Sequence, residues 1–129
     1  MFIQNVYKDN IIQGWHYDVG ENSLLISIVD PDMDHPPSKY PFTSRLNLKF
    51  FDSEDDLPTS IQIDQAQQIR EALYNAKALR QNVLVHCVAG ICRSGAVAEY
   101  AIACLGFDDT ETYRQPNLRV KQMLFNLEY

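Results

Sequence analysis

The segment that decides the fold runs from residue 83 to residue 95 and reads VLVHCVAGICRSG. It opens with Val83–His86, a short run with two β-branched residues that predicts a buried central strand. An alanine-rich stretch, Arg93–Leu105, follows and ends before Gly106, which predicts a helix with a glycine stop. The segment therefore predicts strand, tight loop and helix, and the loop carries both a cysteine and an arginine.

Strand patterns also occur upstream of this segment. Short apolar runs predict strands at Leu24–Val29 and Leu46–Phe51, and a weaker pattern predicts one at Phe2–Val6. Prolines and acidic residues mark Asp30–Ser44 as an irregular loop, and Asp52–Pro58 as a second, strongly acidic loop.

Helix patterns lie between and after the strands. Apolar residues at helical spacing predict a helix over Asp64–Leu79, and Asn117 can cap a last helix. A short helix is expected after Phe107, with Asp108 or Asp109 as its cap. Together these elements predict a small three-layer α/β domain, with a mostly parallel central sheet flanked by helices.

Composition and charge narrow the class of protein. The 129 residues suffice for one domain, and 46% apolar with 22% charged residues is typical of a soluble globular protein. No apolar run approaches the roughly 20 residues that span a bilayer, and the first residues lack the pattern of a secretory signal. We therefore expect a cytoplasmic protein, one domain over 1–129, without a membrane partner. The net charge of −6 argues against nucleic acid as a partner, because it repels a polyanion.

The loop between strand and helix has the composition of a phosphate cradle. Small residues let the backbone curl so that several N–H groups point inward, at the positive end of a helix dipole. That field and a nearby cation favour a thiolate, so we expect the nucleophile Cys87 to be largely ionised at neutral pH. Arg93 presents a planar fork that fits two phosphate oxygens. The expected phosphate-binding residues are Val88, Ala89, Gly90, Ile91, Cys92 and Arg93.

Two side chains next to the nucleophile have expected supporting roles. The Ser94 hydroxyl can donate a hydrogen bond to the sulfur of Cys87 when this sulfur becomes the leaving group, so Ser94 is a candidate catalytic residue. His86 is expected to bond the loop backbone and hold the cysteine in place, and not to act as a base. Because the loop and Arg93 supply the charge stabilisation, no metal or other cofactor is expected.

The string HCVAGICRSG, His86–Gly95, matches the HCxxGxxR(S/T) signature of the protein tyrosine phosphatase superfamily and resembles the dual-specificity phosphatases most closely. The resemblance runs from about Leu24 to the C-terminus. It includes RQPNLRVKQML, Arg114–Leu124, which is similar to the start of that family's last helix. It implies a protein tyrosine phosphatase-like fold and a phosphoryl group transferred first to Cys87 and then to water.

The resemblance also implies a general acid–base aspartate on a separate loop, about thirty residues before the cysteine. Asp52 stands at the end of the strand pattern Leu46–Phe51, and alignment of the next helix with its family counterpart favours this residue. Asp55 is a rival, with Asp56 directly after it.

The composition of the loop narrows the substrate that the resemblance implies. Phosphoinositide phosphatases of this superfamily carry lysines in the loop, whereas the side chains between Cys87 and Arg93 are uncharged here. The loop also departs from the HCTHGxNRTG of RNA triphosphatase relatives. We therefore expect a phosphorylated protein as the substrate, dephosphorylated at phosphotyrosine, with phosphoserine and phosphothreonine as further candidates. Open alternatives are an arsenate reductase, a metabolite or nucleotide phosphatase, and a non-catalytic phosphate-binding module.

The string GICRS is also similar to low-molecular-weight tyrosine phosphatases and arsenate reductases, although the order of motifs along the chain is that of the dual-specificity phosphatases. Relatives with this cysteine spacing form a protective disulfide. A disulfide between Cys87 and Cys92 after oxidation is therefore a hypothesis. The alternative, that Cys92 is a small residue that merely fits the loop, stays open.

Overall fold

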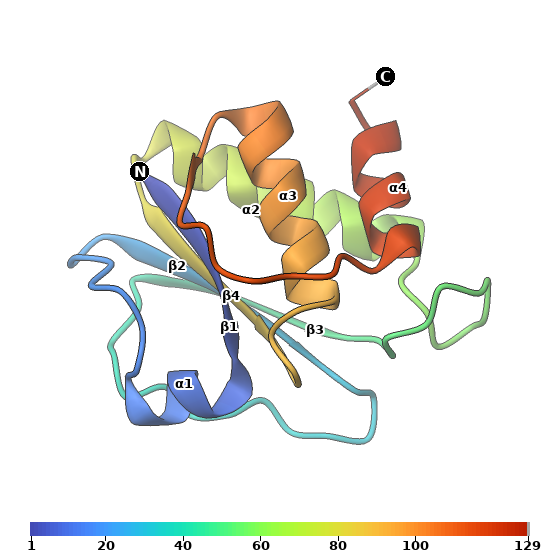
Figure 1. The fold of residues 1–129 in the computed structure, drawn as a ribbon, viewed down its shortest axis with the longest axis horizontal. Coiled ribbons are helices and arrows are strands. Elements are labelled where there is room, and N and C mark those ends of the chain that lie inside the picture. Colours follow the sequence, from blue (N-terminus) through green and yellow to red (C-terminus); the bar gives the residue numbers. More distant parts are fainter. Residues whose placement is uncertain (129) are drawn as a thin grey trace.

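A five-stranded sheet forms the centre of the computed structural model, which describes residues 1–128 (Figure 1). The strands lie in the order β3-β2-β4-β1-β5, and every neighbouring pair is parallel. Their bounds are Phe2–Tyr7 (β1), Ser23–Val29 (β2), Ser44–Lys49 (β3), Asn82–Cys87 (β4) and Asp108–Asp109 (β5). The predicted α/β class with a mostly parallel sheet is confirmed, and the segment around Val83–His86 is its central strand.

Helices cover both faces of this sheet. Their bounds are Lys8–Gln13 (α1), Ile63–Ala78 (α2), Arg93–Leu105 (α3) and Leu118–Asn126 (α4). Figure 1 shows α1 on one face, and α2, α3 and α4 together on the other. The three predicted layers are thus confirmed. Within residues 1–128, none of the helices combines the length and hydropathy that a membrane span requires.

The central strands are buried on both faces, as parallel strands covered by helices must be. Val83 and Val85 of β4 join a large apolar cluster with α2, α3 and α4, whereas Leu84 joins a smaller cluster with Ile11 of α1. β2 is buried along its whole length. Apolar packing on two sides therefore fixes the position of the strand that carries Cys87.

The predicted helical faces are the buried faces. The four apolar residues of α2 at helical spacing are all inaccessible to solvent: Ala66, Ile69, Leu73 and Ala76. α3 begins at Arg93 and ends at Leu105, followed by Gly106 with φ of 76°, as the glycine stop predicts. Asn117 caps α4 by accepting a hydrogen bond from the Val120 backbone N–H at 3.0 Å.

Three local expectations were wrong or incomplete. The short helix expected after Phe107 does not form, because Asp108 and Asp109 pair with β1 as an edge strand. The strand expected to reach Phe51 ends at Lys49, since the Phe51 backbone N–H turns away to donate to Thr59. The sequence analysis also missed α1, which has only six residues and is too short to show a helical repeat.

All strands run parallel, so their carboxyl ends meet at one edge of the sheet. Ligands bind at this edge in open α/β sheets, where loops from neighbouring strands converge. Here β4 delivers Cys87 to the edge, β2 is followed by Asp30, and β3 is followed by Phe50 and the acidic loop. The topology therefore brings together loops that are far apart in sequence.

Candidate active site

The loop between β4 and α3 is pressed tightly against β1. Gly90 has φ of 79°, a left-handed conformation that favours glycine. A Cβ atom on Gly90 would lie 2.5 Å from the backbone nitrogen of Tyr7. The Gly90 carbonyl accepts a hydrogen bond of 2.8 Å from the side chain of Asn5, a buried residue of β1. Only glycine fits here, and the loop curl depends on it.

Replacing Gly90 with alanine is therefore expected to destabilise the protein by about 2 kcal/mol or more, because backbone strain and a backbone clash add. Urea unfolding measures this loss of stability. Gly20→Ala is the matched control, since Gly20 has φ of 78° with no atom within 4 Å of the added Cβ. An equal loss for both variants would show that the contact with β1 contributes nothing.

Cys87 lies at the bottom of this loop. The residue is only 1% exposed. The Gly90 backbone N–H donates to the sulfur at 3.2 Å, and the Ser94 hydroxyl lies 3.2 Å from it. Ser94 is itself fully buried. The structure thus places Cys87 and Ser94 together, at the N-terminal end of α3, as the sequence analysis predicts.

Arg93 is held by two strand ends. Its Nη1 donates to the Asp30 carboxylate at 2.7 Å and to the Phe50 carbonyl at 2.6 Å. The side chain is 4% exposed, and its Nε is buried without a hydrogen-bond partner in residues 1–128. A buried donor without a partner is costly. An oxyanion in the loop would satisfy it, and Asp30 and Phe50 fix one end of the guanidinium so that this edge stays free.

Asp30→Ala is expected to lower kcat/KM by roughly 10- to 100-fold, because Arg93 loses the contact that orients it. Inhibition by inorganic phosphate should weaken in parallel, which a purely structural defect would not cause selectively. Asp30→Asn keeps an oxygen acceptor and should recover most of the loss. The control is Asp64→Asn on the exposed first turn of α2. Unchanged phosphate inhibition in Asp30→Ala would refute an orienting role.

His86 is a fully buried link between the loop and β2. Its Nδ1 lies 3.2 Å from the Cys87 carbonyl, which only accepts, so Nδ1 carries the proton. Its Nε2 then accepts from the Ser27 hydroxyl at 2.6 Å, and Ser27 accepts from His35 at 2.7 Å. Burial lowers the pKa of His86 to about 4. A neutral histidine bonded to backbone holds the loop, as predicted, and is not placed to act as a base.

This lowered pKa predicts an acid-dependent loss of stability. The pKa of His86 is about 4 in the folded protein and about 6.5 when unfolded, so the unfolded chain binds more protons between these values. As the pH decreases through this window, the free energy of unfolding should therefore decrease too. This residue contributes up to about 1.4 kcal/mol per pH unit to the decrease. Urea unfolding of native protein and His86→Gln, at neutral pH and at about pH 5, checks it. Equal losses in the two proteins would contradict it.

Asp52 stands beside the loop on the segment that follows β3. Its carboxylate accepts a hydrogen bond of 2.7 Å from the side chain of Asn117, the buried cap of α4. The Asn117 backbone N–H in turn donates to the Cys92 carbonyl at 2.9 Å. Asp52 and Cys92 also line one cavity of about 280 Å³. Asn117 therefore links the acidic loop to the phosphate-binding loop, residues 88–93, which we call the cradle.

The rival aspartates have other surroundings. Asp56 forms an exposed ion pair of 3.1 Å with Arg119. The carboxylate of Asp55 is exposed and makes no hydrogen bond or ion pair within the described residues. Within the described residues, neither aspartate has a hydrogen bond or ion pair with the loop that holds Cys87. This geometry favours Asp52 as the candidate acid.

Cys92 lies in the cradle wall as a free thiol, like Cys87 and Cys104. Burial raises the pKa of Cys92, and the carboxylate of Asp52 raises it further. The Cys92 side chain is therefore a neutral thiol at neutral pH. Its redox role stays a prediction.

The sequence analysis missed three residues that hold the site. Ser27 lies in β2, Asp30 directly follows β2, and Asn5 lies in β1. The available signal was a polar residue in or directly after a buried strand, which parallel topology brings to the loop. The residue that each of them contacts in the site could not be predicted from the sequence, because the strand order was not known.

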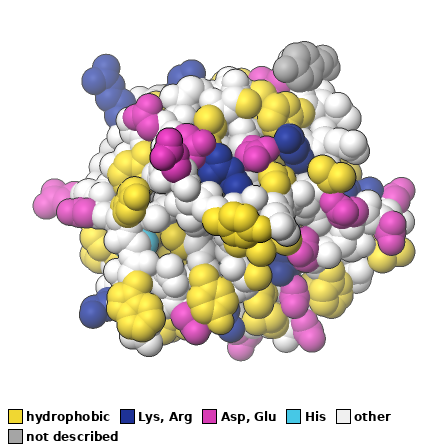
Figure 2. Space-filling model, viewed as in Figure 1, with side chains coloured by type: hydrophobic (Ala, Val, Ile, Leu, Met, Phe, Trp, Pro, Cys, Tyr) yellow, Lys and Arg dark blue, Asp and Glu magenta, His cyan; other side chains and the backbone are white. Residues whose placement is uncertain are grey.

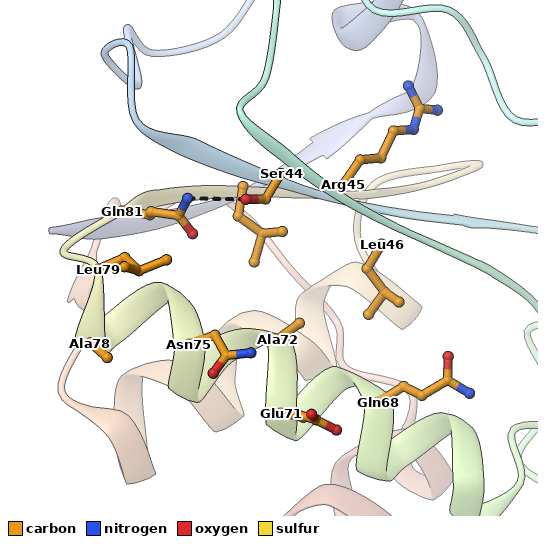
Figure 3. A pocket seen from close by; sticks show the side chains of 11 residues that line it. Ser44, Arg45, Leu46, Gln68, Glu71, Ala72, Asn75, Ala78, Leu79 and Gln81 are labelled. Carbon is orange, nitrogen blue, oxygen red and sulfur yellow. Dashed lines mark hydrogen bonds between the residues drawn. The ribbon is translucent and has the colours of Figure 1, made fainter.

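A cavity of about 520 Å³ lies away from this site, between β3 and α2 (Figure 3). Figure 3 shows Leu46 and Ala72 facing it, while Arg45 points away from α2. Gln81 closes one end by donating to the Ser44 hydroxyl at 3.2 Å. None of the predicted site residues lines this cavity.

Comparison with known proteins shows the fold. No family model matches the sequence, and none of the curated proteins matches it. A solved structure of the human tyrosine phosphatase-like serine/threonine/tyrosine-interacting protein is 20% identical, with a TM-score of 0.58 over 83% of this chain and 76% of that one. A variant of human DUSP28 is 20% identical, with a TM-score of 0.48 over 81% and 62%. By the first match, the chain has the fold of a tyrosine phosphatase-like protein.

Proposed function

We propose that residues 1–129 form one protein phosphatase domain that hydrolyses phosphotyrosine through a phosphocysteine intermediate, with phosphoserine and phosphothreonine as further substrates. The observation that carries this proposal is the arrangement of Cys87 and Arg93. The buried sulfur lies at the bottom of a loop that ends at an arginine whose Nε has no partner in residues 1–128. A nucleophile and an anion-binding edge thus stand at the two ends of one loop.

The first half of the proposed reaction forms the intermediate. The thiolate of Cys87 attacks phosphorus, the bond from phosphorus to the tyrosine oxygen breaks, and protonated Asp52 gives its proton to that oxygen. Arg93 and the backbone N–H groups of the loop stabilise the charge on the phosphoryl oxygens. The reaction therefore needs no metal ion.

The second half releases phosphate. Water attacks the phosphorus of phosphocysteine, the Asp52 carboxylate accepts the proton of this water, and the sulfur leaves as a thiolate. The Ser94 hydroxyl, 3.2 Å from the sulfur, supports this departure by donating a hydrogen bond to it. Cys87, Arg93, Asp52 and Ser94 are thus the proposed catalytic residues.

The uncharged side chains of the cradle support a phosphorylated protein as the substrate. Residues 88–92 carry no lysine or arginine to pair with additional phosphate groups, and the net charge of −6 disfavours nucleic acid. We place this activity in the cytoplasm, with no membrane partner.

A panel of substrates in chelator and reductant tests the proposal. Peptides carrying phosphotyrosine, phosphoserine or phosphothreonine are compared with nucleoside monophosphates and with arsenate in the presence of a thiol. Release of phosphate mainly from phosphotyrosine peptide supports the proposal. Preferred hydrolysis of nucleotides, thiol-dependent reduction of arsenate, or tight phosphopeptide binding without any hydrolysis would each replace it with one of the alternatives.

A further inference from the structure

Two acidic loops border the cradle on the same side. Residues 30–34 follow β2 and residues 52–56 follow β3, and these are the two strands next to β4 on one side of the sheet. Asp30 contacts Arg93 directly, and Asp52 lies with Cys92 around one cavity. Figure 2 shows acidic side chains on the right-hand side of the molecule, where Figure 1 draws the loop that follows β3. The mouth of the pocket is therefore flanked by carboxylates.

Most of these negative charges have no cation beside them. Asp30 is paired with Arg93 and Asp56 with Arg119. Of the remaining five, Asp52 is the proposed acid, and the other four form what we term the rim carboxylates. All are exposed and make no ion pair within the described residues: Asp32, Asp34, Glu54 and Asp55. The Glu54 carboxylate accepts from the Leu118 backbone N–H at 2.6 Å, which holds it in place without neutralising it.

The cations on this side of the sheet do not cancel the rim. Arg45 of β3 donates to Asn47 and to the Pro36 carbonyl. Burial lowers the pKa of His35, and the nearby cations Arg45 and Lys49 lower it further. Arg45 and Lys49 are thus two exposed cations of β3 against the four rim carboxylates. A substrate approaching from this side meets a net negative potential, although the group that it must deliver is itself an anion.

A cavity next to the cradle concentrates this effect. It measures about 280 Å³ and is lined by Asp52, Glu54, Cys92, Gln115, Pro116 and Asn117. Its wall thus holds two carboxylates, two amides and no cation. Cys92 belongs both to the cradle and to this cavity. A peptide side chain that enters the cavity therefore comes from a residue close to the phosphorylated one. The wall favours a cationic side chain and disfavours an anionic one.

We propose that the preferred substrates are phosphopeptides with a lysine or arginine next to the phosphorylated residue, held in this cavity and against the rim carboxylates. This inference rests on the proposed function and adds the substrate class. A basic neighbour offsets the repulsion that the rim exerts on phosphate, whereas an acidic neighbour adds to it. Salt should weaken the preference, because exposed charges are screened beyond about 8 Å at physiological ionic strength.

Binding to the Cys87→Ser protein tests the preference without requiring turnover. Fluorescent phosphotyrosine peptides with lysine and arginine, alanine, or glutamate neighbours are titrated at low salt. The basic peptide should bind about tenfold more tightly than the acidic one. Asp32→Asn with Asp34→Asn, and Glu54→Gln with Asp55→Asn, should each reduce this ratio. Glu71→Gln on the exposed face of α2 is the matched control.

The outcomes separate this inference from the proposed function. Equal affinities, tighter binding of the acidic peptide, or a ratio unchanged by both rim variants would each overturn the inference. Hydrolysis of para-nitrophenyl phosphate by the native protein is measured beside the titrations, and its presence or absence bears on the proposed function alone. Glu54→Gln keeps an acceptor for the Leu118 N–H, so a folding defect does not imitate loss of charge.

Discussion

Replacing Cys87 with serine is expected to lower kcat by at least about 10⁴-fold, because the variant lacks the nucleophile on which both half-reactions depend. A hydroxyl at this position is not ionised near neutral pH, so neither the hydrogen bond from Gly90 nor the N-terminal end of α3 generates a nucleophile. Hydrolysis of para-nitrophenyl phosphate in chelator and reductant measures the loss.

The same variant should keep its fold and its affinity for phosphate. Serine has nearly the shape of cysteine, and Arg93 and the loop N–H groups remain in place. Cys104→Ser is the matched control, since Cys104 is a free, partly exposed thiol on α3 away from the loop. Activity that persists in Cys87→Ser would mean that another group performs the reaction.

Replacing Asp52 with asparagine is expected to lower kcat on phosphotyrosine peptide by about 10²- to 10⁴-fold, because the leaving tyrosine oxygen is no longer protonated. The geometric basis is the hydrogen bond of 2.7 Å from Asn117, which holds the carboxylate beside the cradle. The loss should be smaller for para-nitrophenyl phosphate, whose phenol is more acidic and needs less protonation as it leaves.

This dependence on the leaving group distinguishes a general acid from a residue that only shapes the pocket. Asp55→Asn and Asp56→Asn serve as controls and should leave kcat nearly unchanged on both substrates. A uniform loss on both substrates in Asp52→Asn would indicate a structural role. A selective loss in Asp55→Asn instead would move the acid to that residue.

The sequence predicts those parts of the site that are local in the chain. Cys87, Ser94 and Arg93 lie within eight residues, so their proximity follows from one strand, one tight loop and one helix. The buried face of α2 follows from its apolar spacing, and the cap of α4 follows from Asn117. Local sequence patterns determine these features.

The sequence could not predict contacts that depend on strand order. Asp30 reaches Arg93 only because β2 lies next to β4, and Asn5 reaches Gly90 only because β1 lies on the other side. β5 was missed because two aspartates in a strand contradict local propensity, and their pairing with β1 decides the conformation instead. The position of Asp52 was predictable from the end of a strand pattern, but its orientation by Asn117 was not.

The most direct test of the central claim is to trap the intermediate. The native protein is mixed with phosphotyrosine peptide, quenched in acid during turnover and digested, and the peptide that contains Cys87 is examined by mass spectrometry. We predict one phosphoryl group on the sulfur of Cys87. The phosphorylated fraction of Cys87 should increase strongly in Ser94→Ala, which retains Asp52 as the acid. Turnover with no phosphate on Cys87 at any quench time, or phosphate on a different residue, would contradict the proposed mechanism.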